Sequence, residues 1–329
     1  MITIEPNLRR AIMKIIRRIL SVVVTLFLVL MLAVGGWLVY AIRASIPAVA
    51  GTFKAPGLGG LVQVYRDHFG IPQIYADSSH DLFFAQGYVH AQDRFAQMEF
   101  SRRFASGRLS EVFGASTLEA DRFVRILGWP RAVEKETAVL DDNTRSILQA
   151  YAEGVNAYLN SNSHLGLEFE LMGVAGMKYT PDPWTVADTL AWLKVMSLSM
   201  NSNMGSELRN VQLLQTLDEK SMRELWPTTF QDSPVVVPQG VAYTDLNTTA
   251  LETYLDAIQS LQLAHLGTGS NSWVISGKLT DTGKPYLAND PHLGIQMHPY
   301  GMRWGFIAIR SRSIALMMSR ASRFQACLG

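Results

Sequence analysis

The first strong pattern along the chain is an uncharged, apolar run from Ile19 to Ile42. As a helix this run would span about 36 Å, which is enough to cross a lipid bilayer. A basic cluster precedes the run and Arg43 follows it. The excess of positive charge on the N-terminal side places that end in the cytoplasm. We therefore expect residues 1–44 to form a basic cytoplasmic segment and a single-pass membrane anchor, with the rest of the chain extracytoplasmic or periplasmic.

A cleaved signal peptide is the alternative interpretation of this run. Its length of about 24 residues exceeds the usual apolar region of a signal peptide. No clear small-residue cleavage motif precedes Pro47, although Ala48-Val49-Ala50 is a weak match. Residues 45–60 are rich in proline, glycine and alanine, and we expect them to be a linker.

After the linker, the hydrophobic pattern first indicates strands. Residues 61–67 alternate between apolar and polar positions, and residues 73–76 form a second short run. The turn-forming residues between the two runs predict a β-hairpin.

The pattern then changes to helical spacing. Apolar residues recur at helical intervals over residues 81–104, with Asp77 or Ser79 as the expected N-cap and Gly107 as the break. Further helices are expected over residues 142–159, from Thr185 to about Met196, and over residues 251–266. The pattern therefore predicts that the folded part is mostly helical, with a few short strands.

Residues 267–293 predict a second hairpin, in which a hydroxyl residue stands at the head of an apolar strand. Gly269 removes steric bulk beside Ser270, so a nucleophile could reach the carbonyl group between them. Cleavage there would give Ser270 a free α-amine, which titrates near pH ~8 and can act as a general base. One residue would then supply both nucleophile and base. Thr268 is the alternative nucleophile.

Two motifs in this stretch carry a family resemblance. They read Ser270-Asn271-Ser272-Trp273 and, about twenty residues later, Asn289-Asp290-Pro291-His292-Leu293. Both motifs and their separation resemble the penicillin acylase (penicillin amidase) family of N-terminal-nucleophile hydrolases. Residues 66–111 match the same family, for example in Gly87-Tyr88-Val89-His90-Ala91-Gln92-Asp93-Arg94. The resemblance covers residues 61–297.

The family implies an α+β fold, namely the four-layer αββα fold of N-terminal-nucleophile hydrolases, incomplete here and joined to a mostly helical α-subunit. By resemblance, residues 61–245 are the α-subunit region, residues 246–269 a spacer and residues 270–297 the start of the catalytic β-subunit. Cleavage between Gly269 and Ser270 would leave an α/β heterodimer.

The implied activity is hydrolysis of linear amide C–N bonds in a small N-acyl amide, with Ser270 forming an acyl-enzyme. His292 would orient the Ser270 amine and assist the oxyanion, and Asn271 would hold the turn. The pocket would include Leu293, Met200 and Asn201. An acyl-homoserine lactone is an alternative substrate, and an inactive membrane-tethered fragment is an alternative to an enzyme.

The family also implies a structural calcium ion, with Glu207 as one ligand, and no organic cofactor. One carboxylate is not a calcium site, since Ca²⁺ takes six to eight oxygen ligands. A net charge of +1 gives no indication of a nucleic-acid partner, and the single cysteine permits no internal disulfide. Buried ion pairs and hydrogen bonds are expected for four further polar residues of the family pattern: His90, Asp93, Arg94 and Arg103.

The resemblance stops at Met297. Inserting one base after the Met297 codon turns one choice of codons for residues 298–307 into Pro-Ser-Val-Trp-Tyr-Glu-Val-Gly-Phe-His, which resembles the continuation of the family. Residues 298–329 are therefore interpreted as an out-of-frame tail. Because most of the β-subunit would be missing, we expect this chain to be poorly folded and inactive.

Overall fold

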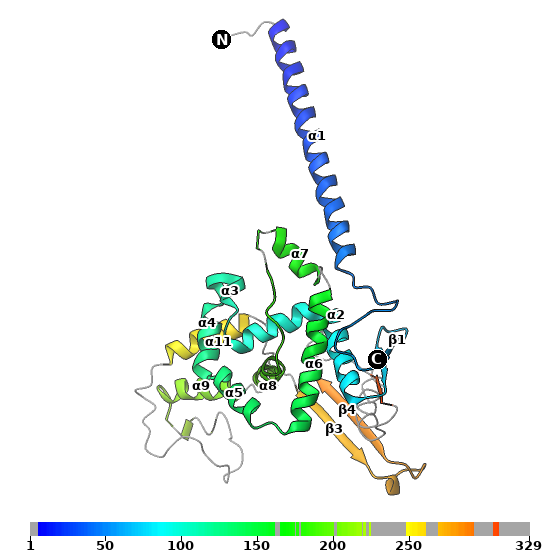
Figure 1. The fold of residues 1–329 in the computed structure, drawn as a ribbon. Coiled ribbons are helices and arrows are strands. Elements are labelled where there is room, and N and C mark those ends of the chain that lie inside the picture. The colour runs from blue at the N-terminus through cyan, green and yellow to red at the C-terminus, as the bar shows by residue number, and fades with distance from the viewer. Residues whose placement is uncertain are drawn as a thin grey trace. The chain divides into compact units, whose positions relative to one another are not determined.

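The structure is a computed structural model, and it describes residues 6–161, 165–174, 176–177, 179–200, 203–218, 220–221, 224, 248–260, 269–292 and 305–308. The chain divides into two compact units. Unit 1 comprises residues 1–53 and 162–180, and unit 2 comprises residues 54–161 and 181–329. Figure 1 shows the elements of both units.

Unit 1 contains the long helix α1 (Pro6–Ser45) and the short helix α7 (Leu167–Val174), which contact each other. From Met13 onward α1 is long and apolar enough to cross a membrane, and no residue of its most apolar 18-residue window is buried. A signal sequence near the N-terminus would have the same properties. The predicted apolar helix is thus present, and the choice between anchor and signal stays open.

Unit 2 holds the remaining helices and all the strands described. Its helices are α2 (Ser79–Ser106), α3 (Ser110–Phe113), the 3₁₀ helix η1 (Gly114–Thr117), α4 (Leu118–Leu127), α5 (Trp129–Ala138), α6 (Asp142–Ser161), α8 (Val186–Met200), α9 (Asn203–Leu214), α11 (Thr249–Ser260) and the 3₁₀ helix η3 (Gly277–Leu279). Buried apolar residues from α2, α4, α5 and α8 form one core cluster, which includes Phe104, Phe123, Val133 and Val195. This cluster gives the helical part an interior of its own.

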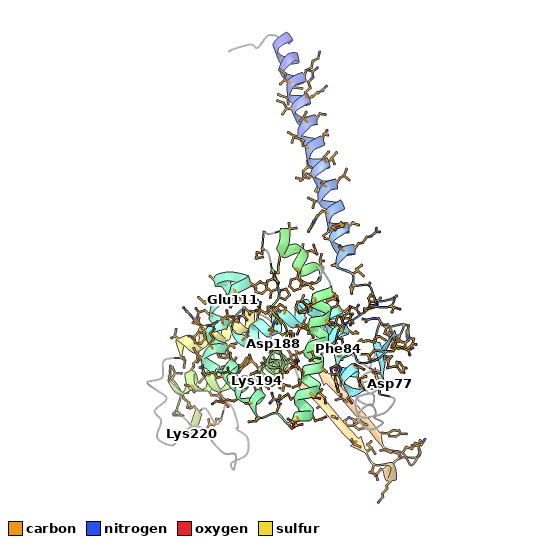
Figure 2. All side chains as sticks on the ribbon, viewed as in Figure 1. Asp77, Phe84, Glu111, Asp188, Lys194 and Lys220 are labelled. Carbon is orange, nitrogen blue, oxygen red and sulfur yellow. The ribbon has the colours of Figure 1, made fainter. Side chains whose placement is uncertain are left out.

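Helices α2 and α6 cross each other (Figure 1), and two glycines lie where they touch. A Cβ atom built on Gly87 would lie 2.0 Å from the backbone oxygen of Tyr151, and one built on Gly154 would lie 1.8 Å from the backbone oxygen of Phe84. Neither position can accept a side chain without movement of a backbone, since interiors are close-packed. The side chain of Phe84, labelled in Figure 2, is itself buried.

The ends of the principal helices follow local capping rules. The Ser78 side chain accepts a 3.0 Å hydrogen bond from the Asp81 backbone N–H, so the cap lies between the two positions expected from the sequence. At the other end of α2, Gly107 adopts φ 64°, the left-handed conformation that glycine allows. Thr185 and Asp188 form reciprocal side-chain-to-backbone hydrogen bonds at the start of α8, where the sequence predicts that a helix begins.

The described strands make two small sheets. Strands β1 (Gln63–Arg66) and β2 (Pro72–Ala76) pair antiparallel, as predicted, and β5 (Gly305–Ala308) pairs parallel with β2. Strands β3 (Gly269–Ile275) and β4 (Tyr286–His292) form the second predicted hairpin. Strand β5 falls within the tail interpreted as out of frame. The four-layer arrangement remains an expectation from the family.

Candidate active site

The β3–β4 hairpin brings the two halves of the candidate site together. In its register, Gly269 lies opposite His292 and Ser270 lies opposite Pro291. The connection is tight, because a Cβ atom on Gly277 would lie 2.4 Å from the backbone oxygen of Gly283. Two motifs that are about twenty residues apart in the sequence are therefore neighbours across one antiparallel ladder.

Ser270, the predicted nucleophile, is exposed near the start of β3. Alternation along the strands puts Ser270, Ser272 and Asn289 on one face of the hairpin. Pro291, the partner of Ser270, has no N–H group to donate to the ladder. The Gly269–Ser270 peptide bond therefore lies at the end of an extended strand, beside an exposed serine.

The other predicted site residues are described less fully. For His292 and Met200 the structure gives the backbone position, at the ends of β4 and α8, and no side-chain geometry. Leu293 and Asn201 lie outside the described residues. Asn271 is exposed and pairs with Asp290. Thus the structure joins the backbone positions of Gly269, Ser270 and His292 and does not test the pocket.

Glu207, the predicted calcium ligand, is an exposed residue of α9. Among the residues that the structure describes, no group of three His, Cys, Asp or Glu side chains could hold a metal ion. Because a calcium site needs several oxygen ligands, the described residues do not make one around Glu207. Calcium stays a prediction, and no chemical step below depends on it.

The polar residues predicted to be structural are indeed engaged in the folded unit. Arg66 holds Asp93 in a bidentate pair at 2.8 and 2.9 Å, which joins β1 to α2. The Nδ1 atom of His90 lies 2.6 Å from the Tyr151 hydroxyl oxygen. Burial lowers the pKa of His90 to about 4, with the charge of Arg94 acting in the same direction. His90 is therefore neutral at pH 7 and has a packing role.

The expected buried ion pair of Arg103 is confirmed, whereas sequence reasoning missed the other members of its cluster, Glu99 and Arg102. Glu99 pairs with Arg102 and also accepts a 2.7 Å hydrogen bond from Nε of Arg103. Arg102 donates to the backbone oxygen of Asp182 at 3.0 Å and lies over the ring of Trp184. The cluster ties α2 to the segment that leads into α8. The spacing of Glu99 three and four residues before the arginines was the available signal.

Comparison with known proteins assigns the family. The penicillin amidase family model matches residues 61–307, which is most of the chain and runs past Met297. The chain belongs to the penicillin amidase family. The penicillin acylase 2 proenzyme of Pseudomonas sp. (strain SE83) is 34% identical over 258 residues, which are 77% of this chain and 33% of that protein.

Other relatives carry two kinds of acylase name. The acyl-homoserine lactone acylase QuiP of Pseudomonas aeruginosa is 30% identical over 282 residues, covering 84% of this chain and 32% of QuiP. The penicillin G acylase of Escherichia coli is 35% identical over 164 residues, covering 48% of this chain and 19% of that protein. The chain thus spans about a third of the length of the first two curated relatives.

A solved structure is also similar, the thermostable penicillin G acylase from Alcaligenes faecalis. It has a TM-score of 0.42 and 26% sequence identity, and the match covers 55% of this chain and 98% of that chain.

Proposed function

We propose that this chain carries the first part of an amide hydrolase that cleaves itself between Gly269 and Ser270 and uses Ser270 as its nucleophile. The observation that carries the proposal is the register of β3 and β4, which sets this bond against His292 and Pro291 in a member of the penicillin amidase family. The relatives named acylases support hydrolysis of an amide C–N bond.

Self-cleavage would create the catalytic groups. Water is consumed as the Gly269–Ser270 amide is hydrolysed, which leaves a carboxylate on Gly269 and an α-amine on Ser270. This amine titrates near pH ~8, so a useful fraction is uncharged at neutral pH. It can then take the proton from the Ser270 hydroxyl group as that oxygen attacks a substrate carbonyl.

The reaction then proceeds through two acyl transfers, first from the substrate to Ser270 and then from Ser270 to water. The tetrahedral intermediate collapses with release of the substrate's amine, which receives the proton, and the acyl group remains as an ester on Ser270. Water, activated by the same α-amine, hydrolyses this ester to a carboxylic acid. We assign His292 to orienting the amine and supporting the oxyanion, and Asn271 to holding the strand start.

The substrate class is a small N-acyl amide. Relatives are named for penicillin and for acyl-homoserine lactone, and both of these compounds contain an acylated nitrogen. Leu293, Met200 and Asn201 are proposed to line the acyl pocket. The spacer at residues 246–269 would be removed to leave an α/β heterodimer, with Glu207 contributing to a structural calcium ion.

The proposed membrane location is supported by α1. Its uncharged apolar span, preceded by basic residues, supports a single-pass anchor with the folded part extracytoplasmic or periplasmic. Substrate would then be met outside the cytoplasm.

The chain as it stands is proposed to be inactive. Apolar side chains of the β3–β4 hairpin are exposed, including Trp273 at 53% and Val274 at 67%, and an isolated two-stranded hairpin is at best marginally stable. The alternative interpretation is that the chain is an inactive membrane-tethered fragment and not part of an enzyme.

The tail supports a shifted reading frame. Residues 298–329 contain no Asp or Glu, although the whole chain has 28 of these residues. The last acidic residue of the chain is Asp290, and the match to the family model ends at residue 307. We propose that the natural coding sequence continues in the other frame.

The test compares this chain with one extended through the restored frame. Intact-mass measurement should find the extended chain cut to expose Ser270, and the cut chain should hydrolyse a chromogenic phenylacetyl or acyl amide. Ser270→Ala should abolish both events, whereas Ser272→Ala, on the same face of β3, should keep both. An extended chain that stays uncut and inactive would refute the hydrolase proposal. Activity in the present chain would refute its inactivity.

A further inference from the structure

Helix α7 contacts α1 at one end of the apolar span. The residues of α1 from Met13 to Gly36 are all exposed. Burial begins with Trp37, which is half-buried, and is complete at Ala41, which is 1% exposed. Ala44 and Ser45 are also half-buried, and helical spacing puts these positions on one face of α1. Because α1 and α7 contact each other, the contact falls at this end of α1.

The contact lies at the depth of a membrane interface. At 1.5 Å per residue, Trp37 stands about 7.5 Å before Ile42, the last residue of the uncharged run, and Arg43 follows. Interfacial helices bury their apolar side about 5–10 Å into the boundary between headgroups and acyl chains. Contact with residues 37–45 therefore holds α7 in this layer once α1 spans the bilayer.

One side of α7 is an exposed apolar stripe. Leu167, Leu171 and Val174 are four and three residues apart, so they share one side of the helix. Leu171 is 47% exposed and Val174 is 63% exposed. Glu168 and Glu170 lie on the two flanks of the stripe by helical rotation. An apolar stripe with a charged residue on each flank is the arrangement by which a helix lies in a lipid interface.

The opposite side of α7 makes contacts of its own. Phe169 stacks on Tyr179, with 5.5 Å between the ring centroids and 25° between the ring planes. Beyond the helix, the Met177 N–H donates a 3.0 Å hydrogen bond to the Met172 carbonyl oxygen, and Gly176 takes φ 81°. This turn satisfies a carbonyl group at the helix end, as a segment that leaves water requires. The stripe is therefore the side of α7 that remains available to lipid.

We propose that α7 is a second membrane contact of this protein, with the stripe of Leu167, Leu171 and Val174 buried in the lipid leaflet beside the end of α1. The occupant of the stripe is the acyl-chain edge of the bilayer. Because both flanks are acidic and α7 contains no basic residue, a zwitterionic phospholipid is sufficient and an anionic lipid is not needed. The inference rests on the proposed membrane anchor.

The test places a fluorophore on the stripe, in the full chain reconstituted into phosphatidylcholine vesicles. The native cysteine is first removed by Cys327→Ser. Leu171→Cys and Val174→Cys are then labelled singly with a nitrobenzoxadiazole group, and vesicles with brominated acyl chains are compared with unbrominated ones. Bromine should lower the emission of both labels. Val139→Cys in unit 2, where Val139 is 83% exposed, is the matched control and should keep its emission.

A label on Val29→Cys, within the apolar run of α1, separates this inference from the anchor. If bromine quenches the Val29 label and leaves both α7 labels as bright as the control, the anchor stands and the lipid contact of α7 is wrong. If Val29 is not quenched either, the anchor proposal fails and takes this inference with it.

Two further outcomes would also overturn the lipid contact. If the α7 labels are shielded from aqueous iodide but unaffected by bromine, protein covers the stripe and lipid is the wrong occupant. If the Val139 label is quenched as strongly as the α7 labels, the chain adheres to lipid without a contact specific to α7.

Discussion

Substitution of Gly154 by alanine offers a direct test of how α2 and α6 pack. The added Cβ atom would lie 1.8 Å from the backbone oxygen of Phe84, whereas a close C···O contact is about 3.4 Å. The two backbones must therefore separate. Overpacking of an interior costs about 1–3 kcal/mol, and a clash with main-chain atoms belongs near the top of that range. Alanine has a better helix propensity than glycine, which offsets about 1 kcal/mol of this loss in stability.

The expected net loss is therefore about 2 kcal/mol, which corresponds to a fall of roughly 4–8 °C in Tm for a cooperative unit of about 150–250 residues. Circular dichroism melting of the detergent-solubilised full chain measures it. Gly173→Ala on α7 is the matched control, because a Cβ atom there meets nothing within 4 Å, and its Tm should not fall. Equal melting of Gly154→Ala and the unchanged chain would refute the close helix crossing.

Two further predictions concern pH and the gene. Because burial lowers the pKa of His90 to about 4, its contribution to stability is complete above pH ~6.5 and is lost as the pH falls towards 4, by roughly 2 kcal/mol at pH 5. Urea midpoints at pH 7 and pH 5 should show this fall, and His90→Gln should lessen it; an undiminished fall in the variant would exclude His90 as its source. Resequencing the DNA across codons 290–310 should reveal one more base after codon 297 and an open frame beyond it. A verified sequence without that base would mean that the gene itself carries the shift.

Local pattern was sufficient for the longer elements of the fold. The apolar spacing over residues 81–104 predicts α2, and the pairing of Thr185 with Asp188 is visible as a capping box. The hairpin β3–β4 follows from two apolar runs joined by glycine-bearing turns, and its existence fixes which backbone segments meet. Helices α4 and α5 were missed because they are short, Gly128 separates them and Pro130 stands in the first turn of α5; in the sequence both residues indicate breaks.

The parts that escaped prediction depend on contacts between distant residues. Glu99 looks like an ordinary helix carboxylate until Arg102 is seen to reach the backbone of Asp182, eighty positions away. The same holds for the α2–α6 crossing, because one sequence shows that Gly154 lacks a side chain and does not show which backbone needs the space. For the candidate site, Ser270 and His292 were chosen by their match to the family motifs. Physical reasoning added only that an N-terminal serine can act as both nucleophile and base.

The bonds between Asn156 and Trp184 have a consequence for how the chain tolerates change. The Asn156 amide accepts from the Trp184 N–H at 2.7 Å and donates to the Trp184 carbonyl oxygen at 2.9 Å. This pair closes the chain on either side of the excursion at residues 162–180, which belongs to the other unit. With both ends held, doubling the length of such a loop costs only about 0.6 kcal/mol in closure entropy. We therefore expect residues 162–180 to accept insertions without a change in the packing of the helical core.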